Sequence, residues 1–270
     1  MADMIIIVII MQCIGDLGKG IWLMMRRVFV VIIALYAVCM AGFIYFENIN
    51  VMPLYANWIK FGGITLGALT AALLWDRSFN RYDATMLLIA LTLTILVDVF
   101  LVHMSRTHSL YGMIVYCVIQ SVYFMRYQYD KSRGVKWRNA FILPLFLIVP
   151  VIFTFLSRQD WFFLYGMADT QRRIVIVTTF YIQTLLAVIV SAARCVRAGR
   201  YPKINGRLIL LALGIFVIAD ITVVLAQPEA FLGFYIPAMR RLIWIFYIPS
   251  QALLALSSYD YDHKAQTSGA

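Results

Sequence analysis

Apolar runs of roughly 17–25 residues recur along this chain, the length that an α-helix needs to cross about 30 Å of hydrocarbon. Hydrophobic residues make up 63% of the 270 positions, and charged residues make up only 13%. The few charges gather between the runs. We therefore expect an all-α integral membrane protein, a multi-pass bundle of about eight transmembrane helices.

The apolar runs place eight predicted spans, with boundaries good to a few residues. In chain order the spans cover residues 28–46, 58–75, 86–102, 109–127, 137–156, 173–193, 207–226 and 234–257. Together they form one transmembrane domain, residues 28–258. Residues 1–27 are interpreted as an N-terminal segment at the membrane interface, and residues 259–270 as a disordered cytoplasmic tail.

Lysine and arginine concentrate on one side of this arrangement. The N-terminal segment, the tail and the loops after the second, fourth and sixth spans hold sixteen of the 23 basic residues, and seven are left for the other side. Basic loops stay in the cytoplasm, so both termini are predicted to be cytoplasmic, in a protein of the plasma membrane. The same bias, with anionic lipid headgroups as partners, explains the net charge of +10 without any nucleic acid.

Two aspartates interrupt these spans, Asp98 in the third and Asp220 in the seventh. A carboxylate inside the bilayer is unfavourable by ~2.5–3.5 kcal/mol on insertion scales, and such residues mark functional sites by default. Each aspartate lies about 18–20 Å from the cytoplasmic end of its span at 1.5 Å per residue. Two interpretations stay open: one shared polar cavity, or two separate carboxyls that hydrogen-bond to neighbouring helices for structure.

Polar side chains follow one face of the fourth and the eighth span. Gln120 and Tyr123 lie in the fourth span, Tyr247 and Gln251 lie in the eighth, and Arg240 lies near its outer end. These five residues are the predicted substrate-binding side chains. Interhelical hydrogen bonds would explain the glutamines and tyrosines equally well. Arg240 and its neighbour Arg241 either hold a phosphate headgroup or extend to the interface.

The sequence contains no phosphate-binding glycine loop, zinc signature or serine nucleophile motif. We therefore expect neither a metal site nor a cofactor. Acid and base chemistry by the aspartates is the enzymatic option that these residues leave.

In the order and spacing of its spans the chain resembles the YhhN-like family of membrane proteins, whose vertebrate members are lysoplasmalogenases. The resemblance rests on four stretches: Asp98-Val-Phe-Leu, Gly112, Gly214-Ile-Phe-Val-Ile-Ala-Asp220, and Phe246-Tyr-Ile-Pro-Ser-Gln-Ala-Leu-Leu-Ala-Leu-Ser257. Three positions differ from the usual pattern, because Val97, Ala219 and Gln120 stand where the family commonly has Gly, Ser and His.

The resemblance implies hydrolysis of the vinyl ether bond of a lysoplasmalogen, with Asp98 and Asp220 as the catalytic acid and base. The expected partners are a lysolipid, or another single-chain amphiphile, and the surrounding membrane lipids. Two carboxyls in a low-dielectric site can divide acid and base roles, as in glycoside hydrolysis. The alternative is a non-enzymatic, proton-coupled transporter or lipid-binding protein whose carboxylates bind protons or a cation. A membrane sensor or scaffold has little support, since no recognisable soluble signalling domain is present.

Overall fold

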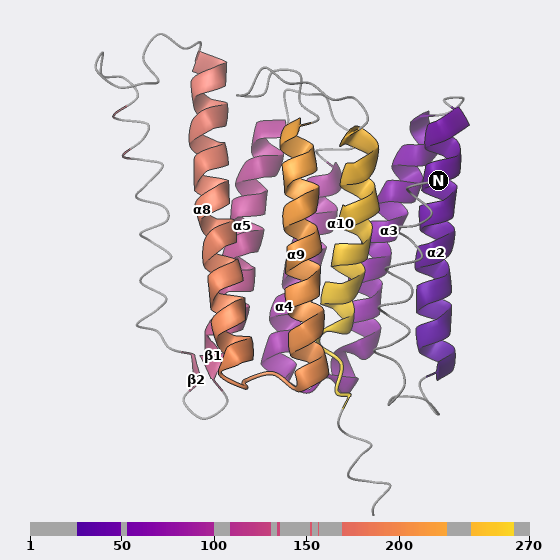
Figure 1. Ribbon diagram of the computed structural model, residues 1–270, viewed down its shortest axis with the longest axis vertical. Coiled ribbons are helices and arrows are strands. Elements are labelled where there is room, and N and C mark those ends of the chain that lie inside the picture. The colour runs from indigo at the N-terminus through magenta and orange to yellow at the C-terminus, as the bar shows by residue number, and fades with distance from the viewer. Residues whose placement is uncertain are drawn as a thin grey trace, which may run out of the picture.

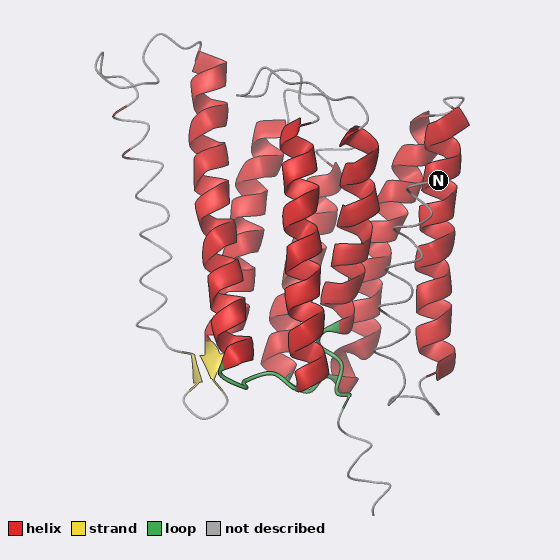
Figure 2. Ribbon diagram, in the orientation of Figure 1, coloured by secondary structure: helices red, strands yellow, loops and turns green. Residues whose placement is uncertain are grey.

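The computed structural model describes residues 26–49, 53–99, 109–130, 134–135, 169–225 and 239–261, with positions 152 and 156. Seven long α-helices account for most of these residues and run side by side as a bundle (Figure 1). They are α2 (Arg26–Ile49), α3 (Pro53–Leu74), α4 (Arg81–Asp98), α5 (Ser109–Gln128), α8 (Asp169–Arg197), α9 (Lys203–Leu225) and α10 (Met239–Leu256). A 3₁₀ turn, η2 (Trp75–Arg77), follows α3, and a short antiparallel pair, β1 (Tyr129–Asp130) and β2 (Gly134–Val135), follows α5 (Figure 2).

Local sequence signals explain several helix ends. The Asn80 side chain caps α4 by accepting hydrogen bonds from the backbone N–H groups of Tyr82 at 2.9 Å and Asp83 at 3.4 Å. Gly199, with a φ of 66°, forms the turn that separates α8 from α9. Pro249 lies inside α10 and has no N–H, so it cannot donate the usual helical hydrogen bond to the carbonyl four residues earlier.

The all-α prediction is confirmed for the described residues, apart from the two-residue strands. Seven of the eight predicted spans coincide with helices, and the predicted span at residues 137–156 lies outside the described residues except for two positions. Three helical segments are long and apolar enough to cross a membrane: Asn57–Arg77, Val175–Arg197 and Lys203–Val223. The predicted N-terminal segment up to residue 25 and the tail after residue 261 also lie outside the described part.

Large apolar side chains cover the outside of the bundle, while many of its buried side chains are polar. Val38 of α2, Leu73 of α3 and Leu186 of α8 are all more than half exposed. Buried polar residues include Asp83, Thr94, Asp98, Gln120, Arg126, Asn205 and Gln251. A water-soluble protein shows the reverse arrangement. Apolar outer faces and internal polar groups are typical of helices that pack within lipid.

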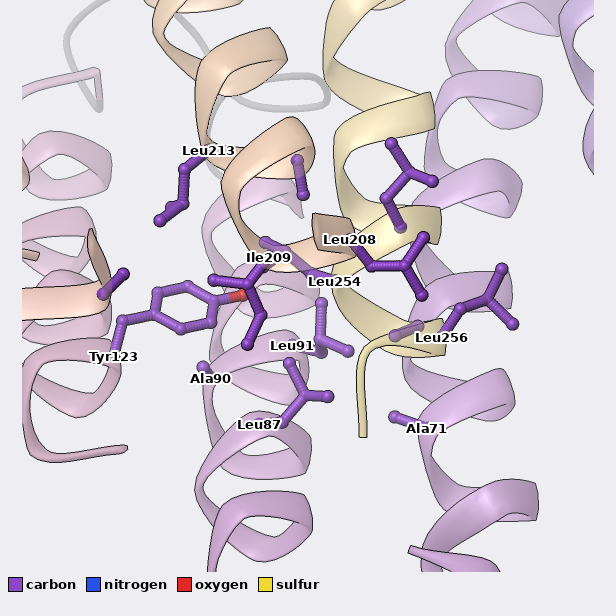
Figure 3. Packing of buried hydrophobic residues seen from close by; sticks show 14 of the residues in the cluster. Ala71, Leu87, Ala90, Leu91, Tyr123, Leu208, Ile209, Leu213, Leu254 and Leu256 are labelled. Atoms are coloured by element: carbon purple, nitrogen blue, oxygen red, sulfur yellow. The ribbon is translucent and has the colours of Figure 1, made fainter. Parts of the chain in front are cut away.

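Helix α10 lies among several of the others, packing against α9, α3, α2 and α4. Gly63 lets α3 approach it closely, because a Cβ at this position would lie 3.1 Å from the Ile248 side chain. The largest apolar cluster joins α3, α4, α5, α8, α9 and α10. Figure 3 shows part of this cluster, including Leu87 and Leu91 of α4 and Leu208 and Ile209 of α9.

The connections rich in basic residues meet at one end of the bundle, which we call the basic end. The α3–α4 connection, the β1–β2 pair, the α8–α9 connection and the residues after α10 all lie there (Figure 1). Backbone hydrogen bonds from Phe79 N–H to the Ser258 carbonyl and from Asp260 N–H to the Arg77 carbonyl fasten the chain after α10 to the α3–α4 connection. This common end agrees with the predicted alternation of loops. The assignment of that end to the cytoplasm stays a prediction.

A buried ion pair joins the helices near the basic end. Arg126 of α5 donates to both carboxylate oxygens of Asp83 in α4, from Nε at 2.8 Å and from Nη2 at 2.7 Å. Tyr201 donates a further hydrogen bond of 2.7 Å to Asp83, and Arg126 Nη2 donates another to Ser257 Oγ at 2.9 Å. Asn205 donates to the carbonyls of Ser257 and Tyr259. The network therefore fixes α4, α5 and the start of α9 to the end of α10.

Candidate active site

Asp98 and Asp220 lie at matching positions in their helices. Asp98 is 17 positions after Arg81, the first residue of α4, and Asp220 is 17 positions after Lys203, the first residue of α9. Both helices begin at the basic end (Figure 1). A rise of 1.5 Å per residue places both carboxyls about 26 Å along their helices from that end.

Two tyrosine hydroxyls connect Asp98 to the neighbouring helices. Asp98 is only 1% exposed, and its Oδ2 accepts a hydrogen bond of 3.3 Å from the Tyr247 hydroxyl of α10. The Tyr247 hydroxyl is also hydrogen-bonded to the Tyr116 hydroxyl of α5.

A third tyrosine binds Asp220. The Tyr181 hydroxyl of α8 donates a hydrogen bond of 2.6 Å to Asp220 Oδ2. The Tyr181 and Tyr116 rings meet edge to face, with their centroids 6.1 Å apart. The Tyr116 hydroxyl lies within electrostatic range of both aspartates. The two carboxyls are therefore linked through Tyr247, Tyr116 and Tyr181, a group that we call the tyrosine cluster.

Apolar side chains surround the tyrosine cluster. Ile64, Phe216 and Ala219 form a buried group with Tyr247, and the Tyr116 and Tyr181 rings pack against it. The Phe216 ring lies 5.9 Å from the Tyr247 ring between centroids. In such surroundings hydrogen bonds and charges are screened less than in water, so each polar contact around the two acids carries more energy.

Two glutamines lie one helical turn from the tyrosines, toward the basic end. Gln120 follows Tyr116 by four positions and interacts with the Tyr181 hydroxyl, and Gln251 follows Tyr247 by four positions. Both side chains are buried, and the Oε1 atom of each has no hydrogen-bond partner among the described residues. Buried acceptors of this kind normally bind a protein group, water or a ligand. The pair can therefore accept hydrogen bonds from water or from a hydroxyl group of a ligand.

The family model of the YhhN family matches residues 59–258, which include both aspartates and the tyrosine cluster. The chain belongs to the YhhN family. Comparison with curated proteins and with solved structures finds no match. Membership of the YhhN family, together with the apolar outer faces and the three helices able to cross a bilayer, identifies a membrane protein.

Within this YhhN family member, four of the seven residues predicted for the site belong to one arrangement. Asp98, Asp220, Tyr247 and Gln120 are joined by the contacts described above. Gln251 is buried and lies beside Gly67 of α3. A Cβ added to this glycine would lie 3.7 Å from the Gln251 Cβ. Tyr123 packs in the large apolar cluster (Figure 3), and no described residue hydrogen-bonds to its hydroxyl.

The two predicted headgroup residues stand in the first turn of α10. The Arg240 side chain lies outside the described part of the protein. Arg241 is described and is exposed. Whether either arginine binds a headgroup stays a prediction.

The structure adds four residues that the sequence analysis did not assign to a site, and Tyr116, which is hydrogen-bonded to Tyr247, is the first. Tyr181 binds Asp220, and the buried pair of Asp83 and Arg126 forms a second polar centre. A tyrosine in an apolar span gives no distinctive signal, because tyrosines in spans often belong to the aromatic belts at the interfaces. No three His, Cys, Asp or Glu side chains come together as metal ligands within the described residues.

Proposed function

We propose that this YhhN family member is an intramembrane hydrolase that cleaves the vinyl ether bond of lysoplasmalogen-type lysolipids. The observation that carries the proposal is the linkage of Asp98 and Asp220, at matching positions in two helices, through one cluster of tyrosines. The family membership supports the same activity. The substrate is a single-chain amphiphile, which reaches a site within the bilayer from the surrounding lipid of the plasma membrane.

The reaction consumes one water molecule, and the protein neither gains nor loses protons over the whole cycle. An acid first protonates the β-carbon of the vinyl ether, which leaves an oxocarbenium cation. Water then adds to the carbon next to the ether oxygen and gives up a proton to a base, forming a hemiacetal. The hemiacetal hydroxyl loses its proton as the glycerol oxygen departs and gains one, so a fatty aldehyde and a glycerophospho-amine are released.

Asp98 suits the role of the acid. Its side chain is almost completely buried, and an isolated carboxylate is costly to remove from water, so burial favours the protonated group. A neutral carboxylic acid is the form that can donate a proton to carbon.

Asp220 suits the role of the base. Its side chain is only partly buried, and the short hydrogen bond from Tyr181 stabilises a negative charge on Oδ2. A carboxylate here would stabilise the oxocarbenium cation and accept the proton of the attacking water. The Oε1 atoms of Gln120 and Gln251, which have no partner within the described part of the chain, would supply acceptors for that water or for the glycerol hydroxyl.

The tyrosine cluster can help to return a proton from Asp220 to Asp98 after each turnover. After one turnover Asp98 has lost a proton and Asp220 has gained one, so the pair must exchange a proton before the next cycle. The Tyr247 and Tyr116 hydroxyls form a hydrogen-bonded path that begins at Asp98, and Tyr181 lies at Asp220. We assign these tyrosines the positioning of the carboxyls and part of this proton return.

The proposal is tested by comparing two lysolipids that differ only in the double bond. Purified protein is incubated with a 1-alkenyl lysophospholipid and with the matching 1-alkyl lysophospholipid, and fatty aldehyde is measured. We expect aldehyde from the alkenyl lipid alone, because protonation at carbon requires the double bond. Lipid uptake by vesicles without any aldehyde from the alkenyl lipid would overturn the proposal and favour the transporter alternative.

A further inference from the structure

Lys60 is a buried cation inside the bundle. It lies on α3, is 9% exposed, and belongs to the part of the chain that the family model matches. Its Nζ atom lies 5.2 Å from the centroid of the Phe43 ring of α2 and 5.3 Å from that of the Trp244 ring of α10. Both rings are within the range of a cation–π interaction, so three helices hold the ammonium group in a defined place.

Trp244 connects Lys60 to the proposed catalytic groups. The Trp244 ring meets the Tyr247 ring edge to face, with their centroids 5.7 Å apart. Tyr247 in turn donates its hydrogen bond to Asp98. Two aromatic side chains therefore separate the ammonium group from the Asp98 carboxyl.

Lys60 and Trp244 lie toward the end of the bundle opposite the basic end. Lys60 is seven positions after Pro53, the first residue of α3, and Trp244 is five positions after Met239, the first residue of α10. Both helices begin at that opposite end (Figure 1). Lys60 thus occupies a place between the tyrosine cluster and one end of the bundle, where a lipid headgroup would lie.

The charge of a lysophospholipid requires a cation in such a place. Its phosphate is joined to the ether oxygen by only the glycerol backbone, so the phosphate must lie close to the two carboxyls when the ether bond reaches them. Like charges in a weakly screened site repel each other. A fixed ammonium group beside the phosphate offsets this repulsion and forms a charge-assisted hydrogen bond with a phosphate oxygen.

We infer that Lys60 binds the phosphate group of the substrate headgroup and positions the ether bond at Asp98 and Asp220. This inference rests on the proposed function. It makes Lys60 a specificity-determining residue that separates phosphate-bearing lysolipids from neutral alkenyl glycerols. Phe43 and Trp244 act as positioning residues for the ammonium group.

The test uses the variant Lys60→Met with two substrates, a 1-alkenyl lysophospholipid and a 1-alkenyl glycerol that has no phosphate. Loss of one charged hydrogen bond should raise KM for the phospholipid by roughly 10–100-fold with little change in kcat. Hydrolysis of the alkenyl glycerol should stay unchanged. Lys60→Arg should restore part of the preference, and Lys203→Met, which removes an exposed lysine at the basic end, serves as the matched control.

Binding of the non-cleavable 1-alkyl lysophospholipid to each variant gives a readout that does not depend on catalysis. We expect Lys60→Met to weaken this binding by the same factor, and free glycerophosphocholine to compete poorly because it lacks the chain. Equal KM values for Lys60→Met and the unmodified protein, with alkenyl lipid still cleaved, would overturn the inference and leave the proposed function standing. A raised KM in Arg241→Met but not in Lys60→Met would place the headgroup at the start of α10 and would also overturn it.

Discussion

The Tyr181 hydroxyl donates a hydrogen bond of 2.6 Å to Asp220 Oδ2, and the ring of the same tyrosine packs against Tyr116. The Tyr116 hydroxyl is hydrogen-bonded to the Tyr247 hydroxyl, which in turn is hydrogen-bonded to Asp98. This relationship joins two acids that are more than a hundred residues apart in the sequence. It also makes Tyr181 the side chain that most directly controls the state of Asp220.

Tyr181→Phe should lower kcat by roughly 10–100-fold, because hydrogen bonds to charged groups contribute about 1.5–3 kcal/mol. KM should change little, since the lost hydroxyl stabilises the carboxylate rather than the lipid. Tyr45→Phe is the control, because Tyr45 is an exposed tyrosine of α2. Aldehyde release at saturating alkenyl lysophospholipid measures the effect, and an unchanged kcat would show that Tyr181 has no part in the reaction.

Breaking the buried pair of Asp83 and Arg126 should destabilise the protein without a direct effect on chemistry. Arg126→Met leaves the buried Asp83 carboxylate without its bidentate partner, and such losses cost about 3–5 kcal/mol. Arg197→Met removes an exposed arginine near the same end and should be nearly neutral. Thermal unfolding in detergent compares the two variants. Equal Tm values would contradict the structural role of the pair.

Gly63 and Gly62 provide a matched comparison for the approach of α3 to α10. A Cβ at position 63 would lie 3.1 Å from Ile248, whereas a Cβ at position 62 would have no atom of the described residues within 4 Å. Gly62→Ala should be neutral or slightly stabilising through its helix propensity. Gly63→Ala should have a lower Tm than Gly62→Ala, because overpacking costs about 1–3 kcal/mol. A higher Tm for Gly63→Ala would show that α3 and α10 separate without cost.

Tyr201, in the α8–α9 connection, should make the free energy of unfolding fall at alkaline pH. Burial, followed by the nearby Asp83 carboxylate, raises the pKa of Tyr201 well above its usual value. Because the folded state favours the protonated phenol, this contribution is complete below the unfolded pKa of about 10 and is lost as the pH rises above it.

Unfolding free energy should therefore fall above pH ~10, with Tyr201 contributing up to about 1.4 kcal/mol per pH unit. Tyr201→Phe should show a shallower fall over the same range. Its stability near pH 7 should be lower by about 1.5–3 kcal/mol, because the hydrogen bond to the Asp83 carboxylate is lost. The same slope in the variant and the unmodified protein would contradict this account of Tyr201.

The positions of the helices and of the two aspartates could be predicted from the sequence, for physical reasons. Span length follows from bilayer thickness, and a carboxylate in an apolar run is conspicuous because it is costly. The helices begin earlier than the predicted spans, at Arg81 and Lys203, so Asp98 and Asp220 each lie 17 positions along their helices, about 26 Å rather than the predicted ~18–20 Å from the helix start.

The partners of these acids could not be predicted, because packing between helices decides them. Tyr181 has no sequence feature that distinguishes it from an interfacial tyrosine. Arg126 lies near the end of the predicted span 109–127, where a basic residue normally reaches the interface, yet it is buried against Asp83 because α4 and α5 pack side by side. The ammonium group of Lys60 likewise lies against Phe43 and Trp244, which belong to two other helices.

Release of fatty aldehyde from a 1-alkenyl lysophospholipid by Asp98→Asn and Asp220→Asn tests the central claim most directly. Asp76→Asn, the same change at an exposed aspartate of η2, is the control. We expect both site variants to remain folded and to lose at least 10²–10⁴-fold in kcat, the usual contribution of a general acid or base, while the control keeps full activity. Full activity in both folded site variants would contradict the account.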